Sequence, residues 1–298
     1  MIKKIVVVVT ILLLVFIYWY NFIALKNFPM ELKDILREYQ YSKRYDIRME
    51  MTEISPRIFT FTYQSFDGSI VNGQISYPSK IAETYPVLLG VSAMGRSYIR
   101  WWVDSFKERP TVTQVNKITT LANSNGYVVI SIDARFHGKR KNPERTLSSI
   151  MNDLSFFGNK VDYEAMIRDT VLDHRVLLDW TERQDNLAKN NTKVVGYSMG
   201  GQIALILGSI DERIEEVISI VPPYIDDRMA VVAPKNVIPL LKDKEVVLLT
   251  ADDDENASIE ENNFIFDLIP SKNKKKIDFE GGHILPDNYV EELSVLFK

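Results

Sequence analysis

The stretch from residue 194 to 208 constrains the fold of this chain most, because a predicted β-branched strand, a glycine-flanked serine and a predicted apolar helix follow one another directly. It reads VVGYSMGGQIALILG and has Ser198 near its centre. A Gly-x-Ser-x-Gly pattern between a strand and a helix is typical of a nucleophile elbow, in which the serine occupies a strained turn. Side chains two residues to either side would clash in that turn, which explains Gly196 and Gly200. The motif alone is a weak signal, since a small-residue turn also lets a helix pack closely on a strand.

The composition is that of an ordinary globular protein and excludes several kinds of chemistry. The 298 residues are 46% hydrophobic and 26% charged, with a formal net charge of -4. This charge gives no reason to expect nucleic acid as a partner. Because the chain has no cysteine, disulfide bonds, thiolate nucleophiles and thiolate metal sites are excluded.

A run of apolar residues, 5–25, stands near the start of the chain. As a helix it is long enough to span the hydrocarbon core of a bilayer. Lys3 and Lys4 precede the run, and Tyr-Trp-Tyr at 18–20 suits the membrane interface at its far end. A cleaved signal peptide is the alternative, but no small-x-small pair follows the run before Lys26. We therefore expect residues 1–26 to form an uncleaved signal-anchor, with the rest of the chain on the extracytoplasmic side of the membrane.

The next residues predict a spacer and then a change of periodicity. Residues 27–48 carry apolar side chains at helical spacing, which favours an amphipathic helical spacer. From residue 49 the pattern has period two, and alternating runs at 58–63 and 70–77 flank Asp67-Gly68. An Asp-Gly pair between such runs predicts a β-hairpin.

After residue 86, predicted strands and helices alternate. We expect strands at 87–91, 127–132, 217–221, 246–250 and 276–279 in addition to the strand before Ser198. Helices are expected at 111–125, 162–181 and 287–297, besides the one after Ser198. This alternation predicts an α/β fold over residues 49–298, in which helices cover both faces of a mostly parallel sheet.

Two later strand ends carry the residue types that a serine nucleophile requires. Ligands bind outside the carboxyl ends of the strands in such sheets. Residues 251–256, ADDDEN, follow one strand, and residues 280–284, EGGHI, follow another. A serine needs a histidine to accept its proton, and the histidine needs a carboxylate to orient it. The order Ser198, acidic loop, His283 is that of α/β-hydrolases.

Residues from about 55 to 298 resemble the α/β-hydrolase superfamily, nearest to its serine esterase and prolyl-oligopeptidase-like branches. The matching pieces, in chain order, are the Asp67-Gly68 hairpin, Ser-Ala-Met-Gly at 92–95, Asp-Ala-Arg-Phe-His-Gly at 133–138, the elbow, the acidic loop and Gly282-His283. One departure is Ser92-Ala93, where many members have His-Gly.

The resemblance also implies which acidic residue acts, and comparison of the three histidines leaves His283, after its two glycines, as the base. The family's acid stands three residues after a glycine whose place Ala251 takes here, which implies Asp254, then Asp253, then Asp252. His174 lies on an apolar helical stripe and is expected at the boundary of the core or within it. His137 lies in a loop that the family uses for shape, so a direct role is the less favoured alternative.

The second group of expected site residues surrounds the serine. Two backbone amides must face the negative charge that develops on the substrate oxygen. The amide of Met199, directly after the nucleophile, is one, and Met94 is chosen for the other, with Ala93 as the alternative. Trp101 and Trp102, with other loop aromatics, are candidates for an apolar substrate pocket or for edge packing. The connection 139–159 is a candidate lid.

These features together predict a membrane-anchored serine hydrolase that cleaves small-molecule carboxylic esters through an acyl-enzyme. No metal or organic cofactor is expected. The enzyme alternatives are a prolyl-oligopeptidase-like peptidase and an acyltransferase. The peptidase is less favoured, because the larger peptidases select peptides with a propeller-sized segment that this sequence does not have before its hydrolase domain. A non-catalytic binding module of hydrolase-like fold is the alternative from a different class.

Overall fold

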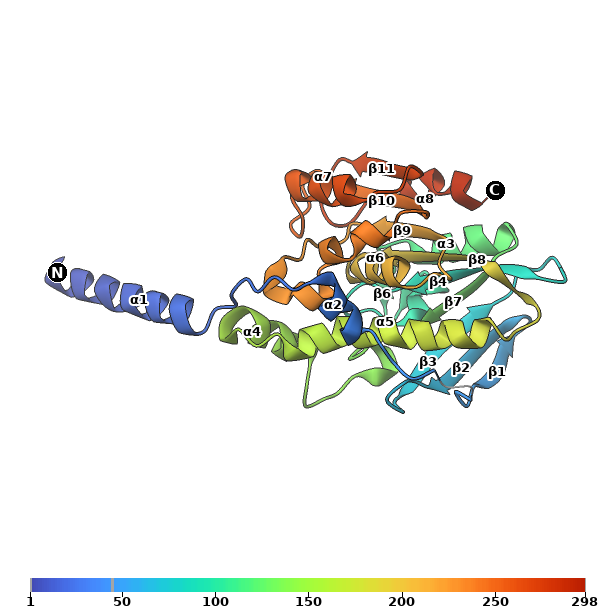
Figure 1. Cartoon of the computed structure of the whole chain (residues 1–298), viewed down its shortest axis with the longest axis horizontal. Helices are drawn as coiled ribbons and strands as arrows, with labels where there is room; N and C mark the ends of the chain where they lie inside the picture. Colours follow the sequence, from blue (N-terminus) through green and yellow to red (C-terminus); the bar gives the residue numbers. More distant parts are fainter. Residues whose placement is uncertain (1, 44–45, 298) are drawn as a thin grey trace.

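A nine-stranded sheet runs through the centre of the computed structural model, which describes residues 2–43 and 46–297 (Figure 1). Three antiparallel strands form one side of the sheet, and from β7 onward all neighbours are parallel. The spatial order is β1 (Glu50–Ser55), β2 (Ile58–Gln64), β3 (Ile70–Ser76), β7 (Val128–Ile132), β4 (Tyr85–Val91), β8 (Leu187–Tyr197), β9 (Glu216–Ile220), β10 (Glu245–Ala251) and β11 (Lys274–Phe279). The predicted fold class, a mostly parallel sheet in an α/β domain, is confirmed.

The central strands are buried on both faces, which is why their sequences are continuous apolar runs. Every residue of β7 and of β9 is buried. Successive residues serve opposite faces, as the period of a strand requires. Leu89 and Val194 belong to the core beneath one layer of helices, whereas Leu88 and Val195 belong to the core beneath the other.

Helices cover both faces of the sheet. The core on one face includes residues of α5 (Val161–Thr181), α6 (Met199–Ile210) and α7 (Ile259–Leu268). The core on the other face includes residues of α3 (Val115–Ser124) and α8 (Tyr289–Glu292). Because helices in such units run antiparallel to the parallel strands, the first turns of α5 and α6 lie at the carboxyl edge of the sheet, where ligands bind.

Two predicted helices are shorter than expected. The helix predicted at 111–125 begins only at Val115, because Gln114 has a φ of 51° that is incompatible with a helical turn. The helix predicted at 287–297 divides into α8 and a 3-10 segment, Ser294–Phe297. The candidate lid at 139–159 is largely α4 (Leu147–Phe157), which Thr146 caps at its start and Gly158 ends with a φ of 61°.

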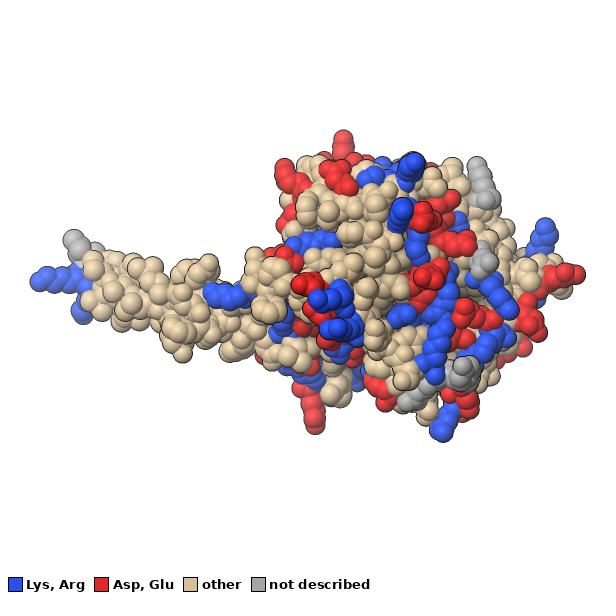
Figure 2. All heavy atoms as spheres, viewed as in Figure 1, with Lys and Arg blue, Asp and Glu red and all other residues tan. Residues whose placement is uncertain are grey.

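The N-terminal helix α1 (Ile2–Phe22) stands apart from the domain. Its span Lys3–Phe22 has a mean hydropathy of 2.4, and none of it is buried. On the face that Figure 2 shows, no charged residue follows the basic residues at the start of this helix. The helix is long and apolar enough to cross a membrane, and a signal sequence near an N-terminus has the same character.

The segment after α1 packs against the domain. Helix α2 (Leu32–Glu38) buries Ile35, and the Tyr39 hydroxyl donates a hydrogen bond to the Val231 carbonyl at 2.9 Å. The Trp19 Nε1–H of α1 donates to the Phe156 carbonyl at the end of α4. The end of α1 therefore lies beside the junction of α4 and α5.

His174 lies in the core, as predicted, and provides a pH dependence of stability. Its Nδ1 is 2.8 Å from the Thr170 carbonyl, and burial lowers its pKa, so the folded protein holds it neutral. The unfolded chain binds a proton below about pH 6.5. Stability is therefore expected to fall as the pH drops through this value, by at most about 1.4 kcal/mol per pH unit for one histidine.

Urea unfolding between pH 7.5 and 5 measures this dependence. In His174→Gln, which keeps a donor for Thr170, the slope of unfolding free energy against pH is expected to decrease. Buried His137, whose pKa is also lowered by burial, accounts for part of the remaining slope. A slope that is the same in both proteins would contradict the prediction.

Candidate active site

Ser198 lies in a sharp turn between β8 and α6, at the carboxyl edge of the sheet. Its backbone angles, φ 57° and ψ −120°, are strongly disfavoured for a residue with a side chain. Its N–H donates to the Ile220 carbonyl at 2.8 Å, which fixes the turn against β9. Ser198 is partly exposed at this edge, while Met199 and the rest of α6 up to Ser209 are buried.

The flanking glycines are required because there is no room for their Cβ atoms. A Cβ on Gly196 would lie 1.9 Å from the Gly200 carbonyl oxygen, and a Cβ on Gly200 would lie 2.1 Å from the Val91 carbonyl oxygen. Contacts this short with backbone force the chain to move. The packing of α6 on the ends of β4 and β8 therefore depends on both glycines.

Gly200→Ala is expected to lower the free energy of unfolding by about 1–3 kcal/mol, the usual range for overpacking. Urea denaturation measures this loss. Gly282→Ala is the matched control, because the nearest atom to its added Cβ is 3.4 Å away. Equal stability of the two variants would contradict the prediction.

Three side chains predicted from distant parts of the sequence meet at this edge. The Ser198 Oγ lies 2.7 Å from the Nε2 of His283. The Nδ1 of His283 lies 3.0 Å from each carboxylate oxygen of Asp254. When Nδ1–H donates to the carboxylate, the lone pair of Nε2 points at the serine hydroxyl, and this is the tautomer that can accept its proton.

The acidic loop brings Asp254, and not Asp252 or Asp253, to the histidine. The loop is tied to the histidine segment by two backbone bonds, from Asp252 N–H to Phe279 and from Asp253 N–H to Gly281. The Asp254 side chain is 1% exposed, whereas Asp252 and Asp253 are exposed. Burial raises the pKa of Asp254, but the hydrogen bonds from His283 and Asn256 outweigh it and hold the pKa below its ordinary value. Asp254 is therefore a carboxylate at neutral pH.

Tyr197 holds the histidine segment, a role that the sequence analysis missed. Its hydroxyl donates to the His283 carbonyl and accepts from the Leu285 N–H, both at 2.9 Å. Its ring is 1% exposed and packs edge-on against His283. The only signal in the sequence is its place between Gly196 and Ser198, where many side chains would fit the motif.

The two amides expected to face the developing oxyanion lie on adjoining segments. Met199 is the first residue of α6, so its N–H has no acceptor within the helix. Met94 follows β4, and its neighbour Ala93 accepts a hydrogen bond from the Arg96 N–H in a tight turn. The close approach of Gly200 to Val91 and Ser92 brings the start of this loop against the start of α6.

The prediction that Trp101 lines a substrate pocket is wrong. Its side chain is 0% exposed, its Nε1–H donates to the Ser92 hydroxyl at 3.1 Å, and its ring covers Gly90 of β4. It is a core residue beneath the loop that follows β4, since a fully buried ring cannot line an open pocket. Trp102 is partly buried against the same core and remains a prediction.

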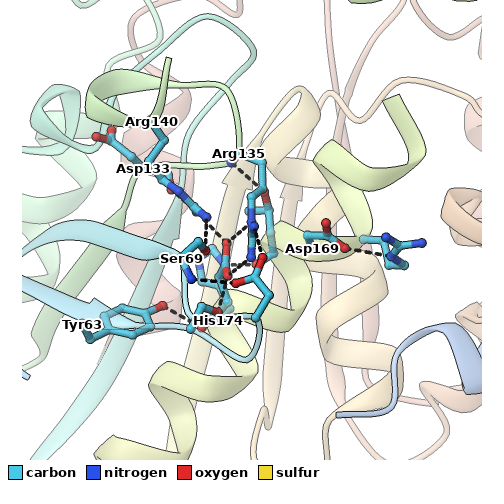
Figure 3. Close-up of polar contacts among 12 residues, drawn as sticks. Tyr63, Ser69, Asp133, Arg135, Arg140, Asp169 and His174 are labelled. Atoms are coloured by element: carbon cyan, nitrogen blue, oxygen red, sulfur yellow. Dashed lines mark hydrogen bonds and ion pairs between the residues drawn. The ribbon is translucent and has the colours of Figure 1, made fainter. Parts of the chain in front are cut away.

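The loop after β7 is fixed by a buried ion cluster, shown in Figure 3. Asp173 of α5 is 0% exposed and accepts from Arg135 at 2.8 Å and from Arg140 at 2.6 Å. Arg135 also pairs with Asp67 of the β2–β3 hairpin. His137 in this loop is buried, and its Nδ1 lies 2.7 Å from the Arg135 carbonyl of the same loop. Within residues 2–43 and 46–297, no cluster of His, Asp or Glu is arranged to hold a metal ion.

Comparison with known proteins agrees with this architecture. The alpha/beta hydrolase fold family model matches residues 115–238. No curated protein sequence matched. Acetyl xylan esterase 1 from Thermoanaerobacterium sp. JW/SL YS485 is similar in structure, with a TM-score of 0.70, 15% identity, and coverage of 92% of this chain and 95% of that one.

Two further structures are similar over much of the domain. A cold-adapted esterase from an Arctic intertidal metagenomic library has a TM-score of 0.58 and 17% identity, with 84% of this chain and 100% of that chain covered. A putative dipeptidyl aminopeptidase IV from Bacteroides ovatus ATCC 8483 has a TM-score of 0.59 and 14% identity, with 84% of this chain but only 36% of that chain covered. The chain thus has the α/β-hydrolase fold. The predicted resemblance to that superfamily is confirmed at the level of the fold.

Proposed function

We propose that this chain is a serine hydrolase that cleaves carboxylic esters. The observation that carries the proposal is the 2.7 Å approach of the Ser198 Oγ to His283 Nε2 at a strained strand-to-helix turn. The pair of 3.0 Å contacts between His283 Nδ1 and Asp254 supports it, because a serine hydroxyl is a weak nucleophile without an oriented base.

The proposed reaction has two halves. Ser198 Oγ attacks the acyl carbon while His283 Nε2 takes its proton, and Asp254 stabilises the imidazolium that forms. The Met199 and Met94 N–H groups donate to the oxyanion, and each such donor is worth about 3 kcal/mol in the transition state. His283 then protonates the leaving alcohol. In the second half, His283 activates water, which attacks the acyl-enzyme and releases the acid and Ser198.

We also propose that residues 1–26 anchor the enzyme in a membrane, with 27–48 as a spacer and 49–298 as the catalytic domain on the extracytoplasmic side. The exposed apolar side chains of Phe156, Phe157 and Val161 support this arrangement, because they lie at the α4–α5 junction that α1 contacts. The same junction leads to Tyr163, which bonds Gln202 four residues after Ser198. The anchor is therefore attached on the side of the domain where Ser198 lies, at the carboxyl edge of the sheet, which we call the catalytic edge.

Labelling with a fluorophosphonate probe tests the proposed reaction. The full-length protein in detergent is expected to label, and Ser198→Ala is expected not to label. A series of p-nitrophenyl esters on the same samples then measures turnover and the size of the acyl pocket. Folded wild-type protein that neither labels nor hydrolyses any ester would refute the proposal and favour a binding module.

Membrane fractionation tests the anchor separately. The intact chain is expected to remain in the membrane fraction after alkaline carbonate washing, with its N-terminal residues still present. Release of a shorter chain that begins after residue 26 would show that the apolar helix is a cleaved signal sequence.

A further inference from the structure

A basic cavity lies beside the catalytic edge, and the proposed reaction does not use it. Its volume is about 510 Å³, and three segments line it: 95–100 after β4, 106–109 in the β5–β6 hairpin (Ser105–Phe106 and Arg109–Pro110), and 138–141 after β7. Six of the lining residues are basic and none is acidic. We call them the basic pocket: Arg96, Arg100, Lys107, Arg109, Lys139 and Lys141.

The positive charge of the basic pocket is not neutralised within the described part of the chain. None of its six side chains forms a salt bridge there, whereas neighbouring Arg135 and Arg140 both pair with buried Asp173. Arg100 is 5% exposed and donates only to neutral groups, the carbonyls of Arg109 and Phe106 and the hydroxyl of Thr111. Burial and the charges of Arg96 and Arg109 lower the pKa of Arg100.

The acidic residues Asp133 and Glu108, which are close to the lining segments in the chain, do not supply a partner for the basic pocket. Asp133 lies behind the cavity at 0% exposure, where its carboxylate accepts the backbone N–H groups of Tyr98 and Lys139. Glu108 is exposed at the tip of the β5–β6 hairpin and does not line the cavity. The charged side chains that an anion would meet in the cavity are therefore all cations.

The basic pocket is joined to the catalytic centre by short, fixed segments. Gly95 in its wall directly follows Met94, the proposed oxyanion donor, so their Cα atoms are about 3.8 Å apart. Asp133 ties the loops after β4 and β7 together through its bonds of 3.1 Å to Tyr98 and 2.8 Å to Lys139. A group in the cavity and an acyl carbon at Ser198 can thus belong to one small molecule.

We propose that the basic pocket binds an oxyanion, phosphate or carboxylate, carried by the ester substrate of Ser198. This assignment rests on the proposed function. Guanidinium and ammonium groups from three segments suit such an oxyanion, because Arg binds it with two parallel hydrogen bonds and Lys adds a point charge. The cavity volume is within the range of small-molecule sites and accommodates the carrier of the charge as well.

Matched esters with and without a charge test the assignment in the full-length protein. One pair is p-nitrophenyl acetate and mono-p-nitrophenyl succinate, with a carboxylate on the acyl side. The other is phenyl acetate and 4-acetoxyphenyl phosphate, with a phosphate on the leaving group. For at least one pair, the ratio of kcat/KM for the charged ester to the neutral ester is expected to fall about tenfold in Lys139→Gln/Lys141→Gln.

The control variant is Lys272→Gln/Lys275→Gln, which removes the same charge from two exposed lysines, one just before β11 and one within it, at the opposite edge of the sheet from β1. It is expected to leave the ratio unchanged. A ratio that is the same in all three proteins, or that falls equally in both variants, would overturn the assignment, because the effect would then be absent or due to net charge alone.

A binding measurement separates failure of the basic pocket from failure of the proposed hydrolase. Phenyl phosphate and benzoate are titrated calorimetrically into full-length Ser198→Ala, with and without Lys139→Gln/Lys141→Gln. We expect binding of at least one probe, weakened about tenfold by the lysine changes. If neither probe binds, the assignment of the basic pocket as an oxyanion site is refuted, whatever the fluorophosphonate probe shows. If a probe binds but Ser198 of the wild type is not labelled, the proposal of an anion site stands and the proposal of a serine hydrolase is refuted.

Discussion

Ser198→Ala is expected to lower kcat for a p-nitrophenyl ester by about 10^4-fold or more, with little change in the melting temperature. The loss is large because the hydroxyl that His283 contacts is the atom that forms the acyl-enzyme in the proposed reaction. His283→Ala is expected to cause a similar loss. The double variant is expected to be hardly slower than either single variant, because the two residues act as a unit.

Steady-state kinetics on the three variants measures this non-additivity. The matched control is Ser124→Ala, which removes an exposed hydroxyl from the end of α3, away from the catalytic edge. Multiplicative losses in the double variant would mean that Ser198 and His283 act independently. That outcome would contradict the mechanism even if each single variant were slow.

Asp173→Asn is expected to lower the free energy of unfolding by about 3–5 kcal/mol, the cost of leaving a buried charge without its partner. Asp173 is fully buried and neutralises both Arg135 and Arg140, while the Ser65 hydroxyl also donates to it. An asparagine cannot neutralise the two guanidinium groups. Because these arginines hold the loop after β7, the variant is also expected to lose activity.

Urea denaturation of Asp169→Asn gives the matched control in the same helix. Asp169 is 16% exposed and pairs with Arg168, which is 30% exposed, so this partly solvated pair is expected to lose less, about 1 kcal/mol. Comparable losses in the two variants would show that burial does not control how much the pairing of Asp173 with Arg135 and Arg140 contributes to stability; Figure 3 shows Arg135, Arg140 and the control residue Asp169.

The sequence was informative about the site because its strongest signals are local. Strand, glycine, serine and helix must be contiguous for the elbow to form, so Ser198, Gly196 and Gly200 were identified together. Asp254 and His283 were selected from short loops that follow strands, and the structure brings both to Ser198. Trp101 was misassigned because a loop aromatic has the same local pattern whether it lines a pocket or is buried beneath β4.

What the sequence determined by itself is the alternation of strands and helices, the apolar N-terminal helix and the elbow, since each is encoded by neighbouring residues. Only the tertiary structure decided the partners: which aspartate faces His283, how Tyr197 holds the histidine segment, and that Asp173 neutralises two arginines. It also gathers six basic residues from three loops around one cavity. The physical reason is that such contacts join residues far apart in the chain. Their energies depend on distance and burial, and the periodicity of a sequence gives neither of these quantities.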